Sequence, residues 1–116
     1  MSKVSLSVGG DIEGEASKRF IAAWHRAERG EQFEERHLAF ESWDTLSRVL
    51  TGKRMELLGY VRRHEVASVR ALAKALGRDY SNVHADVQAL SAAGLVTSGV
   101  SGLTAEYDTI DTQIAI

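Results

Sequence analysis

The chain has 116 residues, of which 44% are hydrophobic and 26% are charged, so it can bury the core of one domain, either alone or with an appendage. It contains no cysteine, which excludes disulfides, thiolate catalysis and cysteine-ligated metals. No apolar run approaches the roughly 20 residues of a membrane span, and the first ten residues lack the pattern of a signal peptide. We therefore expect a cytoplasmic protein that does not bind a membrane.

The net charge of −2 is unevenly distributed along the chain. Residues 51–94 carry seven Lys and Arg against four Asp and Glu, whereas the segments before and after them are net acidic. A basic middle segment can be the electrostatic footprint for a polyanion. The plainer alternative is a solvated surface of mixed charge.

Residues 1–41 predict a strand, a helix and a second strand. Residues 4–8 alternate apolar and polar side chains, which is typical of a short strand. From residue 11 to residue 29 the apolar spacing changes to that of one helical face, and residues 37–41 predict another strand. We expect this extension to dimerise or to bind a partner protein through its large aromatic side chains, together with one from the next helix: Phe20, Trp24, Phe40 and Trp43.

Residues 42–116 predict a separate domain that begins with two helices. Ser42 is a candidate N-cap for a helix over residues 43–50, and Thr51 for a helix over residues 52–64. In the longer helix, Met55, Leu58 and Val61 fall on one face and are expected to point into the core.

Two further helices follow with a short connection between them. Ser68 is expected to cap a helix that ends at Gly77, and Asp79 a helix that ends near Gly94. The inward stripes are expected to be Val69, Leu72, Ala73 and Leu76 in the first of these helices, and Tyr80, Val83, Val87 and Leu90 in the second. This spacing is typical of a helix-turn-helix, and the helix over residues 52–64 would complete a three-helix core.

The last part of the chain predicts strands. Two short β runs, residues 95–97 and 103–107, flank a Gly/Ser turn and predict a hairpin, which after a helix-turn-helix would be a wing. Residues 112–116 alternate and could add another strand. The predicted fold class is α+β and mainly helical: a winged helix-turn-helix with an N-terminal strand–helix–strand extension.

The segment from Leu50 to Asp108 resembles a known family. The resemblance rests on three stretches of sequence: Leu-Thr-Gly-Lys-Arg-Met-Glu-Leu-Leu from residue 50, Gly-Arg-Asp-Tyr-Ser-Asn-Val-His-Ala-Asp-Val from residue 77, and Ala-Leu-Ser-Ala-Ala-Gly-Leu-Val from residue 89. They are similar to the small MarR-like winged-helix regulators of bacteria and archaea. The resemblance implies DNA-binding transcription regulation, and, for some members, the antitoxin role in a toxin–antitoxin pair.

The chain departs from that family where DNA would be read. Ser81, Ala85 and Gln88 stand where the family often has Lys or Arg, and these residues fall on the outer face of the predicted second helix. That face of a helix-turn-helix enters the major groove, where Gln88 could bond an adenine. Phosphate contacts must then come from cations on neighbouring elements. The expected DNA-contacting residues are Lys53, Arg54, Arg70, Lys74, Arg78, Tyr80, Ser81, Asn82, His84 and Gln88.

No catalytic or metal-binding pattern is present in the sequence. The four histidines lack a metal-like spacing, and there is no nucleophile elbow, P-loop or dinucleotide fingerprint, so we expect neither an enzyme nor a cofactor. The leading hypothesis is a homodimeric, sequence-specific regulator that binds palindromic double-stranded DNA and represses its own operon. The alternative is a protein-interaction module, an antitoxin that neutralises a cognate toxin and binds DNA weakly or not at all.

Overall fold

The computed structural model describes residues 2–9 and 34–116, and the fold is α+β. It divides into two compact units, which are considered separately. The first unit takes in the chain up to Leu46 together with Tyr107–Ile116, and the second is Ser47–Glu106. The helix expected over residues 11–29, with Phe20 and Trp24, lies outside the described residues.

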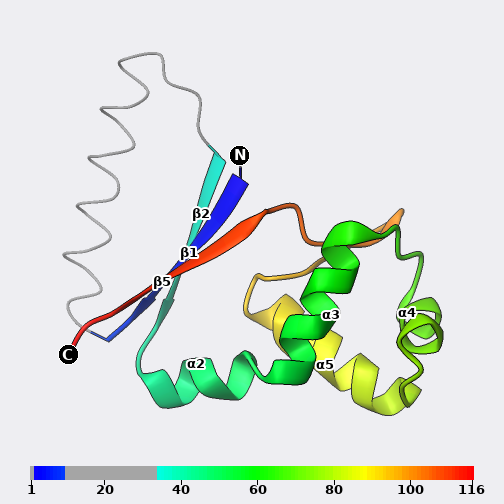
Figure 1. Cartoon of the computed structure of the whole chain (residues 1–116), viewed down its shortest axis with the longest axis horizontal. Helices are drawn as coiled ribbons and strands as arrows, with labels where there is room; N and C mark the ends of the chain where they lie inside the picture. The colour runs from blue at the N-terminus through cyan, green and yellow to red at the C-terminus, as the bar shows by residue number, and fades with distance from the viewer. Residues whose placement is uncertain (1, 10–33) are drawn as a thin grey trace. The chain divides into compact units, whose positions relative to one another are not determined.

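The first unit is built on a parallel sheet of three strands, in the order β2-β1-β5 (Figure 1). These strands are β1 (Ser2–Val8), β2 (Glu34–Phe40) and β5 (Thr109–Ile114). Strands were expected near the first two positions and in the C-terminal tail, and the structure confirms all three with shifted ends. The sequence did not indicate that β5 pairs with β1, which lies about a hundred residues earlier in the chain.

The side chains of the central strand β1 alternate between an apolar face and a polar face of the sheet. Val4, Leu6 and Val8 are buried, as expected from their alternation. On the opposite face, the Lys3 ammonium lies 3.3 Å from the carboxylate of Asp111, and Ser7 Oγ is hydrogen-bonded to the His37 ring at 3.0 Å. A sheet with one apolar face needs cover on that face only.

The division into units differs from the boundary expected after residue 41. It falls inside the short helix α2 (Trp43–Val49), and the last ten residues belong with the N-terminal strands. The cause is the pairing of β1 with β5. At its two ends, the Asp108 N–H donates to the Ser2 carbonyl and the Ala115 N–H donates to the Val8 carbonyl, each with an N···O distance of 2.9 Å. The tail therefore completes the sheet rather than extending the helical domain.

The second unit contains three helices whose N-caps are the expected ones. Helix α3 (Gly52–Arg63) is capped by Thr51, α4 (Val69–Leu76) by Ser68 and α5 (Tyr80–Ala92) by Asp79. Each cap side chain accepts a hydrogen bond from the backbone N–H three residues later, which satisfies a donor that the first turn cannot pair internally.

The connection between α4 and α5 is three residues long. Gly77 adopts φ +64°, a left-handed conformation that glycine reaches at little cost, and it ends α4 as expected. The chain then turns through Arg78 and Asp79 into α5. Two helices joined this closely must cross rather than continue.

The core of the second unit comes from all three helices and the strands that follow. Two residues expected on inward stripes are instead exposed: Met55 in the first turn of α3 and Tyr80 at the start of α5, with 46% and 44% of their surface accessible. Both lie in the first turn of their helices. The buried residues are Leu57, Leu58, Val61, Val66, Leu72, Ala73, Val83, Val87, Leu90, Leu95, Val96, Leu103 and Ala105.

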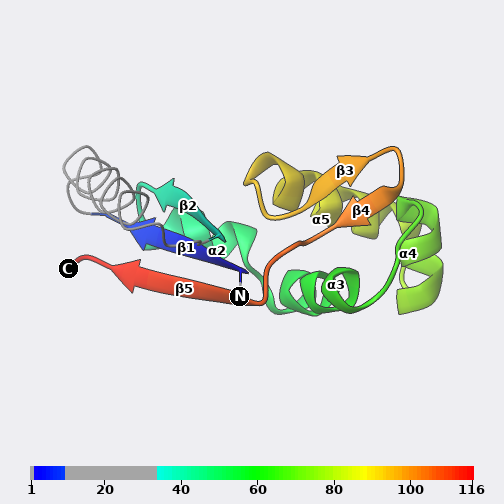
Figure 2. The ribbon, with the colours of Figure 1, turned by 90° about the horizontal axis from the view of Figure 1, so that it is seen from above.

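A small antiparallel hairpin follows α5 (Figure 2). It consists of β3 (Thr97–Gly99) and β4 (Gly102–Thr104). The sequence predicted a hairpin here, but its first strand lies two residues later than expected and its second strand is shorter. Leu103 of β4 also bridges to Val66, which lies between α3 and α4, through a backbone hydrogen bond of 2.8 Å. This bridge ties the hairpin to the start of the helical pair.

Candidate nucleic-acid interface

The outward face of α5 carries no charge of either sign. Ser81, Ala85, Gln88 and Ala92 are exposed, while Val83, Val87 and Leu90 on the opposite face are buried. Apart from Tyr80, the residues expected to face the core of the unit are therefore the ones that are buried. A face of small and neutral polar side chains can approach another surface closely, because nothing on it must be desolvated as an ion.

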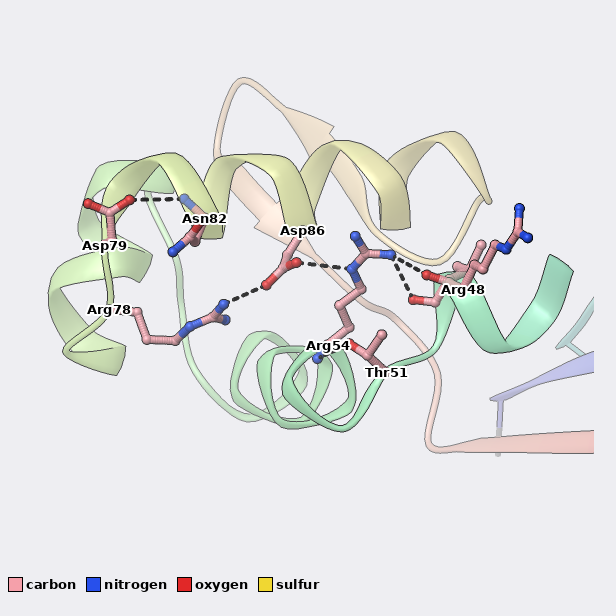
Figure 3. Close-up of polar contacts among 8 residues, drawn as sticks. Arg48, Thr51, Arg54, Arg78, Asp79, Asn82 and Asp86 are labelled. Carbon is pink, nitrogen blue, oxygen red and sulfur yellow. Dashed lines mark hydrogen bonds and ion pairs between the residues drawn. The ribbon is translucent and has the colours of Figure 1, made fainter. Parts of the chain in front are cut away.

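An ionic cluster that we call the Asp86 clamp fixes α5 against α3. Figure 3 shows the Asp86 carboxylate between two guanidinium groups, with Arg54 Nε at 3.0 Å and Arg78 Nη2 at 2.7 Å. Arg54 also donates to the backbone carbonyls of Arg48 at 2.8 Å and Val49 at 3.2 Å. The clamp thus joins the end of α2, the start of α3, the α4–α5 turn and the middle of α5.

The clamp is largely screened from solvent. The side chains of Asp86, Arg54 and Arg78 are only 14%, 18% and 20% exposed. Burial by itself would raise the pKa of Asp86, but the hydrogen bonds and charges of Arg78 and Arg54 outweigh it, and the pKa lies below its ordinary value of 3.8. The carboxylate is therefore ionised throughout the physiological range.

The clamp changes the set of candidate DNA-contacting residues. Arg54 and Arg78 were expected to bind phosphate, but the structure commits both guanidinium groups to Asp86, so we remove them from that set. The sequence analysis missed Asp86. Its position in the sequence could have indicated its role. Asp86 directly precedes the buried Val87 at the border of the apolar stripe, and an acid at such a position in a basic segment needs a cationic partner.

The other three cations of the expected set are exposed: Lys53 at the start of α3, and Arg70 and Lys74 on α4. Among the described residues, no carboxylate lies within ion-pair distance of Lys53 or Lys74. The Arg70 guanidinium carbon lies 5.2 Å from the ring centre of Tyr80, close enough for a cation–π interaction. The Tyr80 and His84 rings are 5.8 Å apart, so one contact series runs from the first turn of α4 to the second turn of α5.

The remaining expected residues divide between exposed and buried positions. Ser81, Asn82, His84 and Gln88 are exposed on α5, as a contact role requires. Of the expected partner interface, Trp43 is 57% exposed, but Phe40 is only 9% exposed. The expectation that Phe40 offers a contact surface is therefore corrected.

Other site types find little support in the described part of the chain. No group of three or more His, Cys, Asp or Glu side chains within it is placed to hold a metal ion. Among its helices, none is both long and apolar enough to cross a membrane.

A groove of about 570 Å³ lies between the end of α3 and the hairpin, with Arg62, His64, Glu65 and Glu106 among its lining residues.

Comparison with known proteins yields one match. A family model described as HVO_A0114 matches residues 49–112, just over half of the chain, and the chain belongs to this family. The matched segment contains the three helices, the Asp86 clamp, the hairpin and the first residues of β5. No curated protein and no solved structure matches the chain.

Proposed function

We propose that this member of the HVO_A0114 family is a winged helix-turn-helix regulator of the MarR-like kind, which binds operator DNA as a homodimer and represses its own operon. The observation that carries the proposal is the exposed, uncharged face of α5, held at a fixed angle by the Asp86 clamp. A helix that reads base edges must be both accessible and rigidly oriented.

The elements around α5 support the same function. Helices α4 and α5 are joined by three residues, and the β3–β4 hairpin follows directly, which is the order of a helix-turn-helix with its wing. Val100 and Ser101 form the tip of this wing, and no basic residue lies in or beside the tip. We therefore assign base reading to α5 and not to the wing.

Phosphate binding is assigned to the exposed cations. Arg70 lies in the first turn of α4, which has no acidic residue, so the free N–H groups and the helix dipole add to its charge. Lys74 follows one turn later, and Lys53 occupies the first turn of α3. Three cations per subunit make six per dimer, enough for a marked salt dependence.

The test is fluorescence anisotropy of the full chain with DNA from upstream of its own gene, against a scrambled duplex at two salt concentrations. Tighter binding to its own DNA with a steep salt slope is the expected result. The double variant Arg70→Ala, Lys74→Ala should reduce the magnitude of the slope of log K against log [salt] by about 2–4. Each phosphate contact that is lost contributes roughly 0.9 to this slope. Arg63→Ala removes an exposed cation from the end of α3 and is the matched control, since it should leave the slope unchanged.

Equal, weak binding to both duplexes would contradict the proposed function. It would favour the second candidate, an antitoxin whose main activity is to neutralise a toxin protein. The observation in favour of that candidate is Trp43, an aromatic side chain exposed at the start of α2. Its test is co-purification with the product of the neighbouring gene, which Trp43→Ala should weaken and Val100→Ala, at another exposed apolar position, should not.

A further inference from the structure

The outer edge of β5 is an unpaired strand edge with an unusual composition for an exposed position. In the described part of the chain, β5 pairs only with β1, and its six residues are exposed except for the half-buried Ile110. It contains one charged residue, Asp111, which pairs with Lys3 of its own chain. Natural proteins protect long exposed edges with charges, proline or bulges, because the free N–H and C=O groups otherwise recruit another strand.

The strand at the opposite edge of the described sheet, β2, has a more charged sequence. Strand β2 begins with the sequence Glu-Glu-Arg-His over residues 34–37. The sequence of β2 is thus rich in charged residues and that of β5 nearly neutral, so β5 is the edge better suited to pairing.

The hydrogen-bond pattern identifies which groups of β5 are free. Ala115 donates its N–H to the Val8 carbonyl, so residue 115 and, by alternation, residues 113, 111 and 109 direct their backbone groups toward β1. The backbone groups of Ile110, Thr112 and Ile114 therefore face the outer edge. Because the β1–β5 ladder does not use them, a new strand can pair with them without disturbing the fold.

We propose that this edge pairs with the same edge of a second copy of the chain, antiparallel and with the twofold axis at Thr112. This register pairs Thr112 with itself and Ile110 with Ile114 of the partner, and it uses every free backbone group of β5. The inference rests on the homodimer in the proposed function, for which it supplies the surface.

Side-chain complementarity selects this register. On the apolar face it aligns Val8 and Ile114 of one chain with Ile110 and Val4 of the other, a continuous aliphatic row across the interface. On the polar face it places Asp111 opposite Gln113 of the partner. An axis at residue 111 would instead set two Asp111 carboxylates directly opposite each other, which is repulsive.

The same pairing explains how assembly would stop at two copies. Among the strands of residues 2–9 and 34–116, joining the β5 edges makes one sheet of six strands whose outer strands are both β2, each with its charged sequence. The interface is isologous and closes on itself, and neither remaining edge is suited to further growth.

Position 113 provides a matched pair of variants, and the readout is the dimer dissociation constant of the full chain without DNA, by analytical ultracentrifugation. Gln113→Lys places a cation opposite Asp111 of the partner twice per dimer and should tighten the dimer about 2- to 30-fold, while Gln113→Glu should weaken it by a similar factor. Ser98→Lys and Ser98→Glu make the same charge changes at an exposed position on β3 and should leave the constant unaltered.

Cross-linking tests the register in a chain that has no native cysteine. Thr112→Cys places two thiols across the axis with Cα atoms about 5.5 Å apart, within the range of a disulfide. Ile110→Cys places them about 14 Å apart, out of reach. Under mild oxidation, only Thr112→Cys should give a covalent dimer.

The outcomes separate this inference from the proposed function. A chain that sediments as a monomer would overturn the edge pairing and the homodimer together, while anisotropy would still decide DNA binding. A dimer that is insensitive to the charge at residue 113, or that cross-links equally through residues 110 and 112, would overturn the β5 surface alone.

Discussion

Arg54 Nε and Asp86 Oδ1 lie 3.0 Å apart, although the two residues are separated by 32 positions in the sequence. Their contact connects the first turn of α3 to the middle of α5. Arg78 reaches the other oxygen of the same carboxylate from the α4–α5 turn. One carboxylate therefore sets both the position of α5 and the geometry of the turn that leads into it.

Removing the charge of Asp86 should destabilise the second unit. Asp86→Asn keeps the shape of the side chain but leaves two largely buried guanidinium groups without an anion. We expect a loss of about 2–4 kcal/mol in the free energy of unfolding, measured by urea denaturation. Asp111→Asn breaks an exposed ion pair and is the control, with an expected loss below about 1 kcal/mol. Equal losses in the two variants would show that the clamp does not stabilise the fold.

The stabilisation from Asp86 should disappear in acid. Its pKa in the folded protein lies below the ordinary value of 3.8, so the ionised clamp contributes its full stability above that value. As the pH falls from 3.8 through the lower pKa of the folded state, the carboxyl takes up a proton and the contribution is lost. The difference in unfolding free energy between wild type and Asp86→Asn should thus be constant from pH 7 to about pH 5 and shrink below that. A difference that persists undiminished at the acid limit would contradict the cause that we assign to the pKa shift.

Tyr107 should make the first unit sensitive to alkali. Its burial raises the pKa of the phenol above the ordinary value of 10, an effect that the nearby charge of Arg36 opposes but does not cancel. The neutral phenol is the favoured form in the folded state, so its stabilisation is complete below pH 10 and is lost as the pH rises through the higher folded pKa. Thermal unfolding at pH 9 to 11 should show a steeper loss of stability for wild type than for Tyr107→Phe, and parallel slopes would refute this.

Gly102 should be intolerant of any side chain. It adopts φ +117°, and a Cβ at this position would collide with the backbone carbonyl of Val66, the same group that accepts the hydrogen bond from Leu103. Gly102→Ala should cost at least about 2 kcal/mol, with loss of the bridge that anchors the hairpin. Gly99→Ala in the other strand meets open space and should change stability by no more than about 1 kcal/mol. Hydrogen exchange of the Leu103 amide would localise the effect.

Gln88 should contribute to DNA specificity without contributing to the salt dependence. It is exposed on the uncharged face of α5, and the proposed function assigns it to a base edge. Gln88→Ala should reduce the discrimination between own and scrambled DNA by about 1–3 kcal/mol per subunit at an unchanged salt slope. Ala92→Ser, one turn further along the same face, is the control. A uniform loss on both duplexes would instead indicate phosphate contact.

The local elements of this chain could be predicted because their causes are local. Ser68 and Asp79 cap helices through their own side chains, and Gly77 ends one through its own backbone freedom. The alternation in β1 and the apolar spacing in α5 likewise report burial directly. The sequence therefore predicted correctly which face of α5 is exposed.

What only the tertiary structure decided involves partners that are distant in the chain. The sequence identified Arg54 and Arg78 as cations in a basic segment and suggested that they bind phosphate. In the structure both pair with one carboxylate, Asp86, which lies 32 residues after Arg54 and 8 residues after Arg78. The tail was recognisable as a strand, yet only the β1–β5 ladder shows that it belongs to the N-terminal unit and leaves an edge with free backbone groups. Capping and periodicity act within a few residues, whereas ion pairing and strand pairing depend on which residues the folded chain brings together.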